Sequence, residues 1–296
     1  MSSLNFDRVS HILSPEYLRD KKVVQVGLGS GGAPVCDHLV MNGVRRWDLF
    51  DPDKLDDVNL VKHPRLRADL GRHKVEIQRE WILDRNPDAQ VSPYPEDVFT
   101  SGDFGECVRT SSLVLCCADK RDARLFVGDV ARKYSTPCVT ASVYRQGFGG
   151  EIYSYLPGQT GCFACLERAA EDMEININDS IQPTAEEERQ VYGLNNRDFQ
   201  ASGLSLDIQA ICLLQARVAL SILTSEAPRR IAGPKANWLI YYNRPIPGIK
   251  ESGFSKLAVV RFIVRPRKDC PCSGTGEFTR TQSACENITG SPSKSH

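Results

Sequence analysis

A glycine-rich turn that directly follows a short apolar run is the feature that most constrains how this chain folds. The run, Lys21 to Val26, is rich in valine and is followed at once by Gly27-Leu28-Gly29-Ser30-Gly31-Gly32, which fits the pattern G-x-G-x-x-G. Apolar residues then recur at helical spacing until Asn42-Gly43, a typical helix stop. The segment therefore predicts a strand, a tight turn and a helix, with backbone N–H groups available to a phosphate.

Strand and helix patterns alternate along the first half of the chain. The run Leu113 to Cys117 is continuously apolar, as expected of a strand that is buried in a parallel sheet. Strand patterns also occur at Trp47–Phe50 and Cys138–Val143, and helical patterns at Arg72–Arg85 and Arg121–Tyr134. This alternation predicts an α/β fold with a Rossmann-like, doubly wound and mostly parallel sheet.

The second half has a different pattern. We expect a buried helix at Leu204–Leu223, and three C-terminal antiparallel strands, each with one exposed face, at Glu151–Leu156, Asn237–Tyr242 and Ala258–Val264. The stretch 166–202 is polar and predicts a crossover loop. Residues 273–296 are rich in Ser, Thr and Gly and predict a disordered tail, which leaves a single domain over residues 1–272.

Composition narrows the function classes. Lys plus Arg and Asp plus Glu are both 37, so the formal net charge is zero and nothing indicates a nucleic-acid-binding surface. The first residues lack the apolar core of a signal peptide, and the apolar stretch Leu204–Leu223 is interrupted by Asp207 and Arg217. We therefore expect a cytoplasmic protein with no membrane partner, whose eleven cysteines serve as thiols or thiolate ligands.

An acidic residue lies where a nucleotide-binding fold needs one. Asp51 ends the second predicted strand about 20 residues beyond the glycine turn, and a carboxylate there can hold ribose hydroxyls, with Asp53 close behind. The turn itself serves NAD and ATP equally. The alternative is that the glycines only form a tight turn and that Asp51-Pro52-Asp53 is a surface turn.

Four further side chains suit a triphosphate. Asn59 and Lys62 follow Asp53, Lys74 begins the next predicted helix, and Asp119 comes directly after the buried strand. Because the carboxyl ends of parallel strands converge, we expect these groups to share one crevice. The lysines would neutralise phosphate oxygens and Asp119 would hold Mg²⁺, which phosphoryl chemistry needs and hydride transfer does not.

Two close cysteine pairs lie about a hundred residues apart. Cys162 and Cys165 form C-x₂-C, and Cys270 and Cys272 form C-x-C, which has a narrower bite. Four thiolates suit a closed tetrahedral Zn²⁺ site. A redox dithiol and unbound buried thiols are the alternatives. The other cysteines of residues 1–272 lie in apolar runs or near element ends, as core residues do, whereas His11, His38, His63 and His73 show no metal or triad spacing.

In combination these motifs resemble the ThiF/MoeB/HesA and ubiquitin-activating enzyme superfamily from about Phe6 to Cys272. The landmarks are, besides the glycine turn and Asp51-Pro52-Asp53, Asn59-Leu60-Val61-Lys62, Gly71-Arg72-His73-Lys74, Cys116-Cys117-Ala118-Asp119, Gly161-Cys162-Phe163-Ala164-Cys165 and Asp269-Cys270-Pro271-Cys272. The resemblance implies a homodimer that binds ATP, Mg²⁺ and Zn²⁺ and adenylates the C-terminal glycine of a ubiquitin-like or sulfur-carrier protein, with a downstream conjugating enzyme as a further partner. By position, Ser30 and the glycines would hold phosphate, Asp51 ribose, Asn59, Lys62 and Lys74 the phosphates, and Asp119 magnesium.

The chain departs from the family pattern at several positions. Lys62 replaces an arginine, which keeps the charge but loses the planar fork, and Lys120 replaces an asparagine. An N-terminal arginine that the family inserts into the neighbouring subunit would fall near His11, with Arg8 the nearest substitute. No cysteine occurs between Cys165 and Cys212, so the predicted crossover loop offers no thiol for a thioester.

Two other functions fit parts of the sequence. An NAD-dependent oxidoreductase would use the same glycine turn, but it would leave Lys62, Lys74 and Asp119 without a role. A catalytically inactive scaffold subunit would pair with an active partner and would need none of the phosphate-binding groups. The sequence favours the adenylating enzyme over both.

Overall fold

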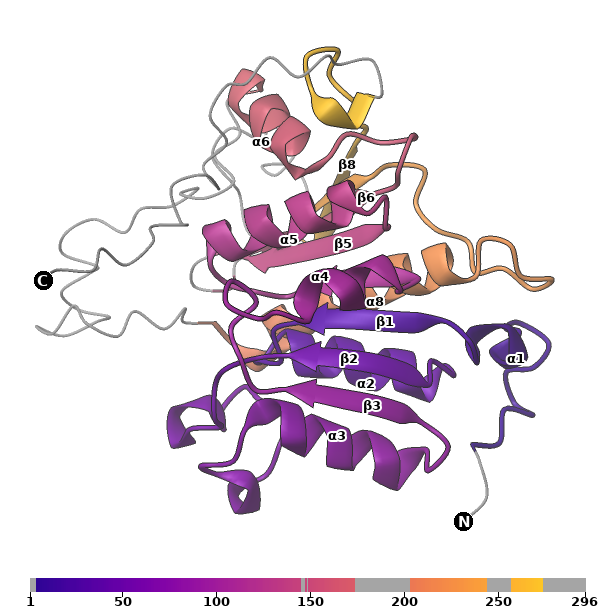
Figure 1. Ribbon diagram of the computed structural model, residues 1–296, viewed down its shortest axis with the longest axis vertical. Coiled ribbons are helices and arrows are strands. Elements are labelled where there is room, and N and C mark those ends of the chain that lie inside the picture. Colours follow the sequence, from indigo (N-terminus) through magenta and orange to yellow (C-terminus); the bar gives the residue numbers. More distant parts are fainter. Residues whose placement is uncertain (1–3, 145–146, 148, 174–202, 244–256, 274–296) are drawn as a thin grey trace, which may run out of the picture.

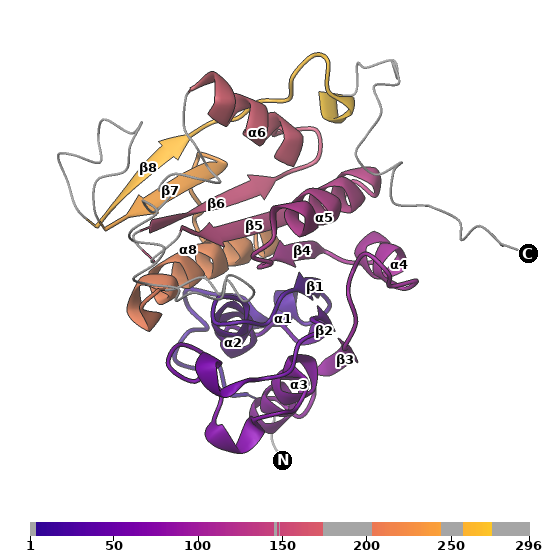
Figure 2. The same cartoon turned by 90° about the vertical axis from the view of Figure 1, so that its left-hand side faces the viewer.

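One twisted sheet with helices on both faces forms the body of the protein (Figures 1 and 2). The computed structural model describes residues 4–144, 147, 149–173, 203–243 and 257–273. Eight strands run through the sheet in the order β3-β2-β1-β4-β5-β6-β7-β8. In the described residues the strands are β1 Lys22–Val26, β2 Arg46–Phe50, β3 Gln90–Tyr94, β4 Leu113–Cys116, β5 Cys138–Val143, β6 Gly149–Tyr155, β7 Trp238–Tyr242 and β8 Ala258–Phe262.

Helices connect the parallel strands and cover the sheet. The α-helices are α1 Pro15–Leu18, α2 Gly32–Met41, α3 Lys74–Arg85, α4 Phe104–Arg109, α5 Arg121–Lys133, α6 Phe163–Asp172 and α8 Ser205–Leu223. Short 3₁₀ turns lie at Asp57–Asn59, Arg67–Asp69 and Pro271–Ser273. Helices α2, α3 and α8 pack on one face of the sheet, and α4, α5 and α6 pack on the other (Figure 2).

The sheet has a parallel half and an antiparallel half. Strands β3, β2, β1, β4 and β5 are parallel neighbours, whereas β6, β7 and β8 each run antiparallel to the strand before them. This confirms the predicted doubly wound sheet with C-terminal antiparallel strands. The chain order reverses between β1 and β4, so the carboxyl ends of these two strands define the switch point at which α/β proteins bind ligands.

Burial shows why the predicted strands form. Every residue of β4 is buried, as its continuous apolar run predicts, and Val23 and Val24 of β1 are fully inaccessible. The large aromatic residues Trp47, Phe50 and Trp238 fill the two cores between the sheet and its helices. Burial of each such ring contributes about 2–3 kcal/mol to stability before conformational entropy is subtracted.

The sequence interpretation was wrong in two places. Strands β6 and β7 have no exposed face, because their side chains pack into the two cores on either side of the sheet. Strand β3 and helix α4 were not anticipated. The first is a half-exposed edge strand that contains Pro93 and the second is only six residues long, so neither carries a clear period.

Helix α8 is the one described helix that is long and apolar enough, by length and composition alone, to cross a membrane. Half of its apolar window is buried inside the structure, against α2 and strands β5 and β6. This is the environment of a core helix, and core helices meet the same length and composition criteria.

Part of the predicted crossover loop is helical, since α6 extends through its first residues to Asp172. The remaining crossover residues, 174–202, lie outside the described residues, as do residues 274–296 of the tail. The predictions for those two segments therefore stay predictions.

Candidate functional site

The glycine turn is shaped by close backbone contacts at two of its glycines. Gly27 has a φ of +89°, and a Cβ there would lie 2.9 Å from the carbonyl carbon of Cys117 after β4. A Cβ at Gly32 would lie 2.0 Å from the carbonyl oxygen of Gly27. Only glycine fits either position, because any side chain would push the turn away from the sheet. The side chain of Gln25 holds the same turn by donating to the carbonyls of Gly27 and Gly32 at 3.1 and 2.7 Å.

The outer side of the turn is open. Among the described residues, no atom beyond the neighbouring residues of the chain lies within 4 Å of an ideal Cβ at Gly29 or Gly31, and Gly31 is the N-cap of α2. The first N–H groups of α2 have no intrahelical partners, and the helix dipole adds positive potential there. The turn therefore offers donors and space to an anion, although the role predicted for Ser30 and these glycines remains a prediction.

Asp51 is part of the architecture of this turn. It directly follows β2, is 5% exposed, and accepts hydrogen bonds from the N–H of Leu28 at 2.6 Å and of Asp53 at 2.9 Å. Burial raises the pKa of Asp51, while the charge of Lys74 and the two N–H donors act in the opposite direction. Each carboxylate oxygen has a second lone pair, so the predicted ribose contact is compatible with these bonds.

His63 holds the turn from the other side, which the sequence did not reveal. Its Nε2 lies 2.9 Å from the carbonyl oxygen of Leu28, and its Nδ1 accepts from the N–H of Arg65 at 3.2 Å. The second bond fixes the tautomer, so Nε2 carries the proton and donates to Leu28. Burial lowers the pKa of His63 to about 4, which keeps the ring neutral near pH 7. The ring thus fixes the residue next to Lys62 against the turn.

A buried charged network supports this segment. Arg65 donates to both carboxylate oxygens of Asp37 on α2 and to Gln78 Oε1 on α3 at 2.6 Å, and Gln78 in turn donates to Asp37 at 2.9 Å. The guanidinium also lies over the ring of Trp81, 4.9 Å from its centroid. A bidentate, stacked arginine is strongly oriented. The network therefore ties the segment after Lys62 to two helices.

Lys62 and Asp119 interact electrostatically near the switch point. The ammonium of Lys62 is half-buried and Asp119, after β4, is exposed. Burial lowers the pKa of Lys62, and the nearby carboxylate of Asp119 opposes this shift. Arg124 of α5 fixes the loop that carries Asp119 by donating to the carbonyls of Ala118 and Asp119 at 3.2 and 2.8 Å. The two charges therefore influence each other near the glycine turn, while their predicted roles with phosphate and Mg²⁺ stay predictions.

Lys74 and Asn59 occupy separate positions near the turn. Lys74 begins α3, is 9% exposed, and forms an ion pair of 2.7 Å with Asp53, whose side chain is 66% exposed. Asn59 caps a 3₁₀ turn by accepting from the N–H of Asp56 at 3.2 Å. In this structure these two predicted phosphate ligands thus already contact other groups of the protein. A phosphate would have to compete with Asp53 for Lys74.

Helix α8 closes the inner side of the site. Gln215 donates to the carbonyls of Cys116 and Val139 at 3.4 and 3.2 Å, and Cys212 donates to the carbonyl of Gly31 at 3.1 Å. Burial raises the pKa of Cys212 to about 12 and that of Cys116 to about 11, so both are neutral thiols near pH 7. The prediction that these cysteines are core residues is confirmed by their burial.

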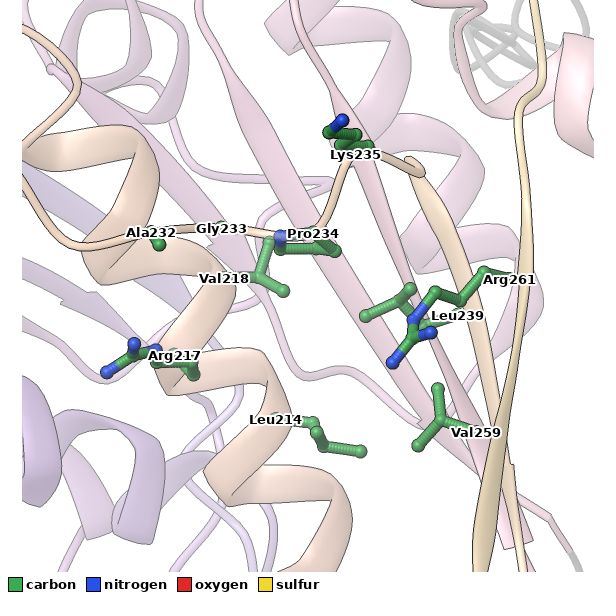
Figure 3. A pocket seen from close by; sticks show the side chains of 10 residues that line it. All are labelled: Leu214, Arg217, Val218, Ala232, Gly233, Pro234, Lys235, Leu239, Val259 and Arg261. Carbon is green, nitrogen blue, oxygen red and sulfur yellow. The ribbon is translucent and has the colours of Figure 1, made fainter.

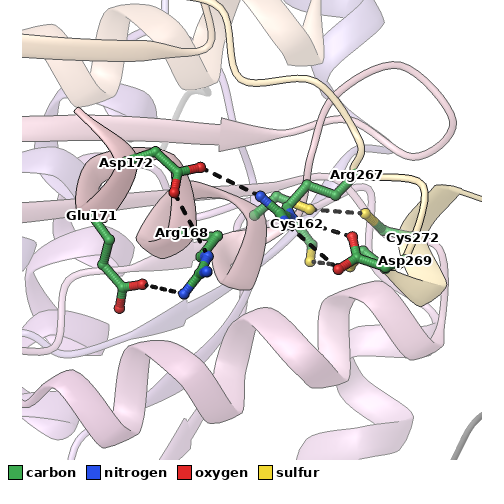
Figure 4. A network of polar contacts seen from close by, with 9 residues as sticks. Cys162, Arg168, Glu171, Asp172, Arg267, Asp269 and Cys272 are labelled. Atoms are coloured by element: carbon green, nitrogen blue, oxygen red, sulfur yellow. Dashed lines mark hydrogen bonds and ion pairs between the residues drawn. The ribbon is translucent and has the colours of Figure 1, made fainter.

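The four paired cysteines form one cluster at the end of the antiparallel half (Figure 4). All four sulfur atoms lie within 4.8 Å of one another, and Cys162–Cys270 and Cys165–Cys272 are each 3.5 Å apart. A tetrahedral zinc with bonds of about 2.3 Å sets its sulfurs about 3.8 Å apart. The predicted clustering is confirmed, and this donor set fits Zn²⁺; the short C-x-C pair reaches the same centre.

Surrounding contacts bring the two halves of the cluster together. Gly161 permits close approach, since a Cβ there would lie 2.7 Å from the Cβ of Cys165, and Tyr153 donates to the carbonyl of Cys162 at 3.2 Å. Arg267 lies between Asp172 of α6 and Asp269, at 3.5 and 3.2 Å (Figure 4). Each such exposed ion pair contributes only about 0–1 kcal/mol to stability, so these pairs alone do not hold the four cysteines together.

The fold and the turn define a Rossmann-like α/β protein with a phosphate-type glycine turn at its switch point and a four-cysteine cluster beside the sheet. The model of the ThiF family matches residues 4–245. The chain belongs to the ThiF family.

Relatives and solved structures agree with this assignment. Ubiquitin-like modifier-activating enzyme 5 of Caenorhabditis briggsae is 30% identical over 169 residues, covering 54% of this chain and 39% of the relative. The Drosophila willistoni protein of the same name is 27% identical, covering 53% and 42%. The matched stretch thus spans about two fifths of these relatives. The crystal structure of E. coli MccB with ATP shares the fold, with a TM-score of 0.65, 17% identity, and coverage of 88% and 69%.

Proposed function

We propose that this protein is an ATP-dependent adenylating enzyme that activates the C-terminal glycine carboxylate of a small ubiquitin-like or sulfur-carrier protein. The observation that carries the proposal is the glycine turn, which is open on its outer side and lies at the switch point of the sheet, where Lys62 and Asp119 are close enough to interact electrostatically. ThiF membership supports adenylation of a ubiquitin-like protein or a peptide in general, because its relatives include activating enzymes. An NAD-dependent oxidoreductase would have no use for this cation–carboxylate pair.

The proposed reaction needs little covalent help from the protein. A terminal carboxylate is ionised at neutral pH, so its oxygen attacks the α-phosphorus directly, and the bond to the β-phosphate oxygen breaks to release pyrophosphate. The product is the acyl-adenylate. Catalysis then consists of alignment and charge neutralisation, which the turn N–H groups, Lys62 and Lys74 would supply.

Asp119 would hold Mg²⁺ in this scheme. It offers one exposed carboxylate, and magnesium in nucleotide sites usually takes one or two carboxylates together with phosphate oxygens and water. The ion would supply neutralisation of phosphate charge. Arg124 keeps the loop of Asp119 in place through its two carbonyls, and Asp119 in turn favours the charged form of Lys62.

Exchange of labelled pyrophosphate into ATP tests the proposal directly. The natural protein should catalyse exchange only when Mg²⁺ and a carrier protein ending in glycine are both present. Asp119→Asn should lower the exchange rate by at least about a hundredfold without changing the melting temperature. The matched control is Asp122→Asn, an exposed carboxylate in the first turn of α5, which should exchange normally. Undiminished exchange in Asp119→Asn would remove this residue from the mechanism.

We also propose that the reaction stops at the acyl-adenylate in this chain. No cysteine lies between Cys165 and Cys212, and a thiol attack requires a thiolate that reaches the carbonyl carbon. Cys285 of the tail is the exception to test. Enzyme, ATP and carrier should yield no adduct on gels run without reductant. An adduct that disappears with reductant and survives Cys285→Ser would refute this reading.

The same assays separate the adenylating enzyme from a scaffold subunit. A scaffold would bind a partner chain but would show no exchange by itself. A homodimer in sedimentation measurements, together with exchange, would support an active enzyme that functions without a second kind of subunit. A downstream conjugating enzyme is a further proposed partner, and its binding would depend on the carrier being activated first.

A further inference from the structure

A second concave surface lies away from the glycine turn, between helix α8 and the last two strands (Figure 3). This groove has a volume of about 530 Å³. Apolar side chains from α8, β7 and β8 form its floor: Leu214, Val218, Leu239 and Val259. The segment 232–235, which leads from α8 towards β7, closes one end. Apolar floors of this size are suited to receiving side chains of a ligand.

Cations surround this apolar floor. Arg217 of α8, Lys235 of the connecting segment and Arg261 of β8 all line the groove, and in Figure 3 their side chains stand around its rim. In the parts of the chain that the structure describes, none of these three has an ion-pair partner. Three uncompensated cations in a protein of zero net charge create a local positive potential.

The groove borders an open sheet edge. β8 is the last strand of the sheet, and no described strand pairs with its outer side. Its side chains alternate, so Val259 and Arg261 line the groove while Val260 and Phe262 pack against the core on the opposite face. An edge of this kind presents unpaired N–H and C=O groups to an extended peptide.

We propose that this groove binds an extended, acidic segment of a partner protein, which adds alongside β8. Backbone bonds to the strand edge would fix the segment, and alternate side chains would point towards α8. Carboxylates at those positions would meet Arg217, Lys235 and Arg261, and an apolar residue between them would cover Leu214 and Val259. This inference goes beyond the proposed adenylation and does not depend on it.

The same features argue against a small ion as the occupant. A small free anion would satisfy the cations but would leave the apolar floor and the strand edge uncovered. An extended acidic segment is the ligand whose chemistry matches the floor, the rim and the edge together.

The test measures, by fluorescence anisotropy, binding to the full chain of a labelled peptide in which every second residue is threonine and the residues between read glutamate, valine, glutamate, so that one face of the extended peptide carries both carboxylates and an apolar group. Arg217→Glu and Arg261→Glu should each weaken binding by about fivefold, the size expected for one exposed ion pair. The control is Arg46→Glu, an exposed arginine at the start of β2, which should leave binding unchanged. The peptide with lysine in place of glutamate should not bind. Pyrophosphate exchange should be normal in all three variants.

Strand addition has its own test. Two forms of the glutamate peptide carry N-methyl groups on the odd or on the even residues. Only one of them should bind at least about tenfold more weakly, because only every second N–H of an added strand points to the β8 edge. Three outcomes would overturn the proposal: no binding of the glutamate peptide, equal binding of the lysine peptide, or equal binding of both N-methylated forms. If Arg217→Glu changes the oligomeric state in sedimentation but not peptide binding, the groove is an interface between copies of this chain. That result would also overturn the proposal.

Discussion

The imidazole Nε2 of His63 lies 2.9 Å from the carbonyl oxygen of Leu28, while the N–H of Leu28 lies 2.6 Å from Asp51. The peptide groups on both sides of Leu28 are therefore held by buried side chains from two different segments. A turn that must present its N–H groups to phosphate gains from such support, because misplaced donors lose most of their value. His63 acts through the turn and is a positioning residue.

Replacing His63 separates positioning from chemistry. His63→Ala should raise the KM for ATP in pyrophosphate exchange by about tenfold, the value of one lost buried hydrogen bond, with a smaller effect on kcat. His63→Gln should recover much of the loss, since its amide N–H can donate to Leu28. The control is His38→Ala, a partly buried histidine in the last turn of α2, at the far end of this helix from the glycine turn. Equal KM values in all variants would show that the turn holds its shape without the imidazole.

The two adjacent glycines at the start of α2 should behave differently. Gly31 has a helical backbone with φ −89° and open space around its Cβ position, so Gly31→Ala should fold normally and weaken ATP binding by filling the anion space. Gly32→Ala should lower the melting temperature sharply, because its methyl would collide with the Gly27 carbonyl. Thermal unfolding with and without ATP measures both effects. Unchanged ATP binding in Gly31→Ala would place the phosphates elsewhere.

Zinc should hold the C-terminal segment against the sheet. We expect one zinc per chain by elemental analysis, and Cys270→Ser should lose the metal and lower the melting temperature. The control Cys285→Ser, in the tail outside the described residues, should keep both. A chelator should reproduce the Cys270→Ser effect on stability. Metal-free protein with the full melting temperature would contradict a structural zinc.

The sequence predicted four of the five parallel strands and the cysteine cluster because each leaves a local signal. Val23, Val24 and Val26 precede the glycine turn in a short valine-rich run, and the spacing of Cys162 and Cys165 is visible within four residues. Contacts between distant segments leave no such signal. His63 reaches Leu28 across 35 positions, and nothing in its neighbourhood distinguishes it from a surface histidine.

The burial of β6 was missed for the same reason. Its sequence carries the polar residues Glu151 and Ser154, one on each face, yet both are buried because α8 covers one face of the strand and the core that includes α6 covers the other. Polar residues in a buried strand are tolerated when they find partners. Glu151 has two: it accepts from Ser142 and from the indole N–H of Trp238, each at 2.9 Å.

Glu151 should make the protein less stable as the pH rises. Burial raises its pKa to about 7 in the folded state, from an ordinary value of 4.5. Between these two values the folded protein binds more protons than the unfolded chain, so the free energy of unfolding falls with increasing pH, by up to about 3 kcal/mol from this group. Below the pKa that Glu151 has in the unfolded chain, its full contribution to stability is present. This contribution is lost as the pH rises through the pKa of the folded state.

Glu151→Gln should remove this part of the pH dependence. The amide oxygen can accept from Trp238 and the amide N–H can donate to the Ser142 hydroxyl, so both polar contacts are kept while the buried charge is abolished. Urea unfolding at about pH 5 and about pH 8 should therefore show the variant gaining stability relative to the natural protein as the pH rises. Glu16→Gln, at an exposed position in α1, should leave the slope unchanged. The same slope in Glu151→Gln and the natural protein would mean that another group titrates.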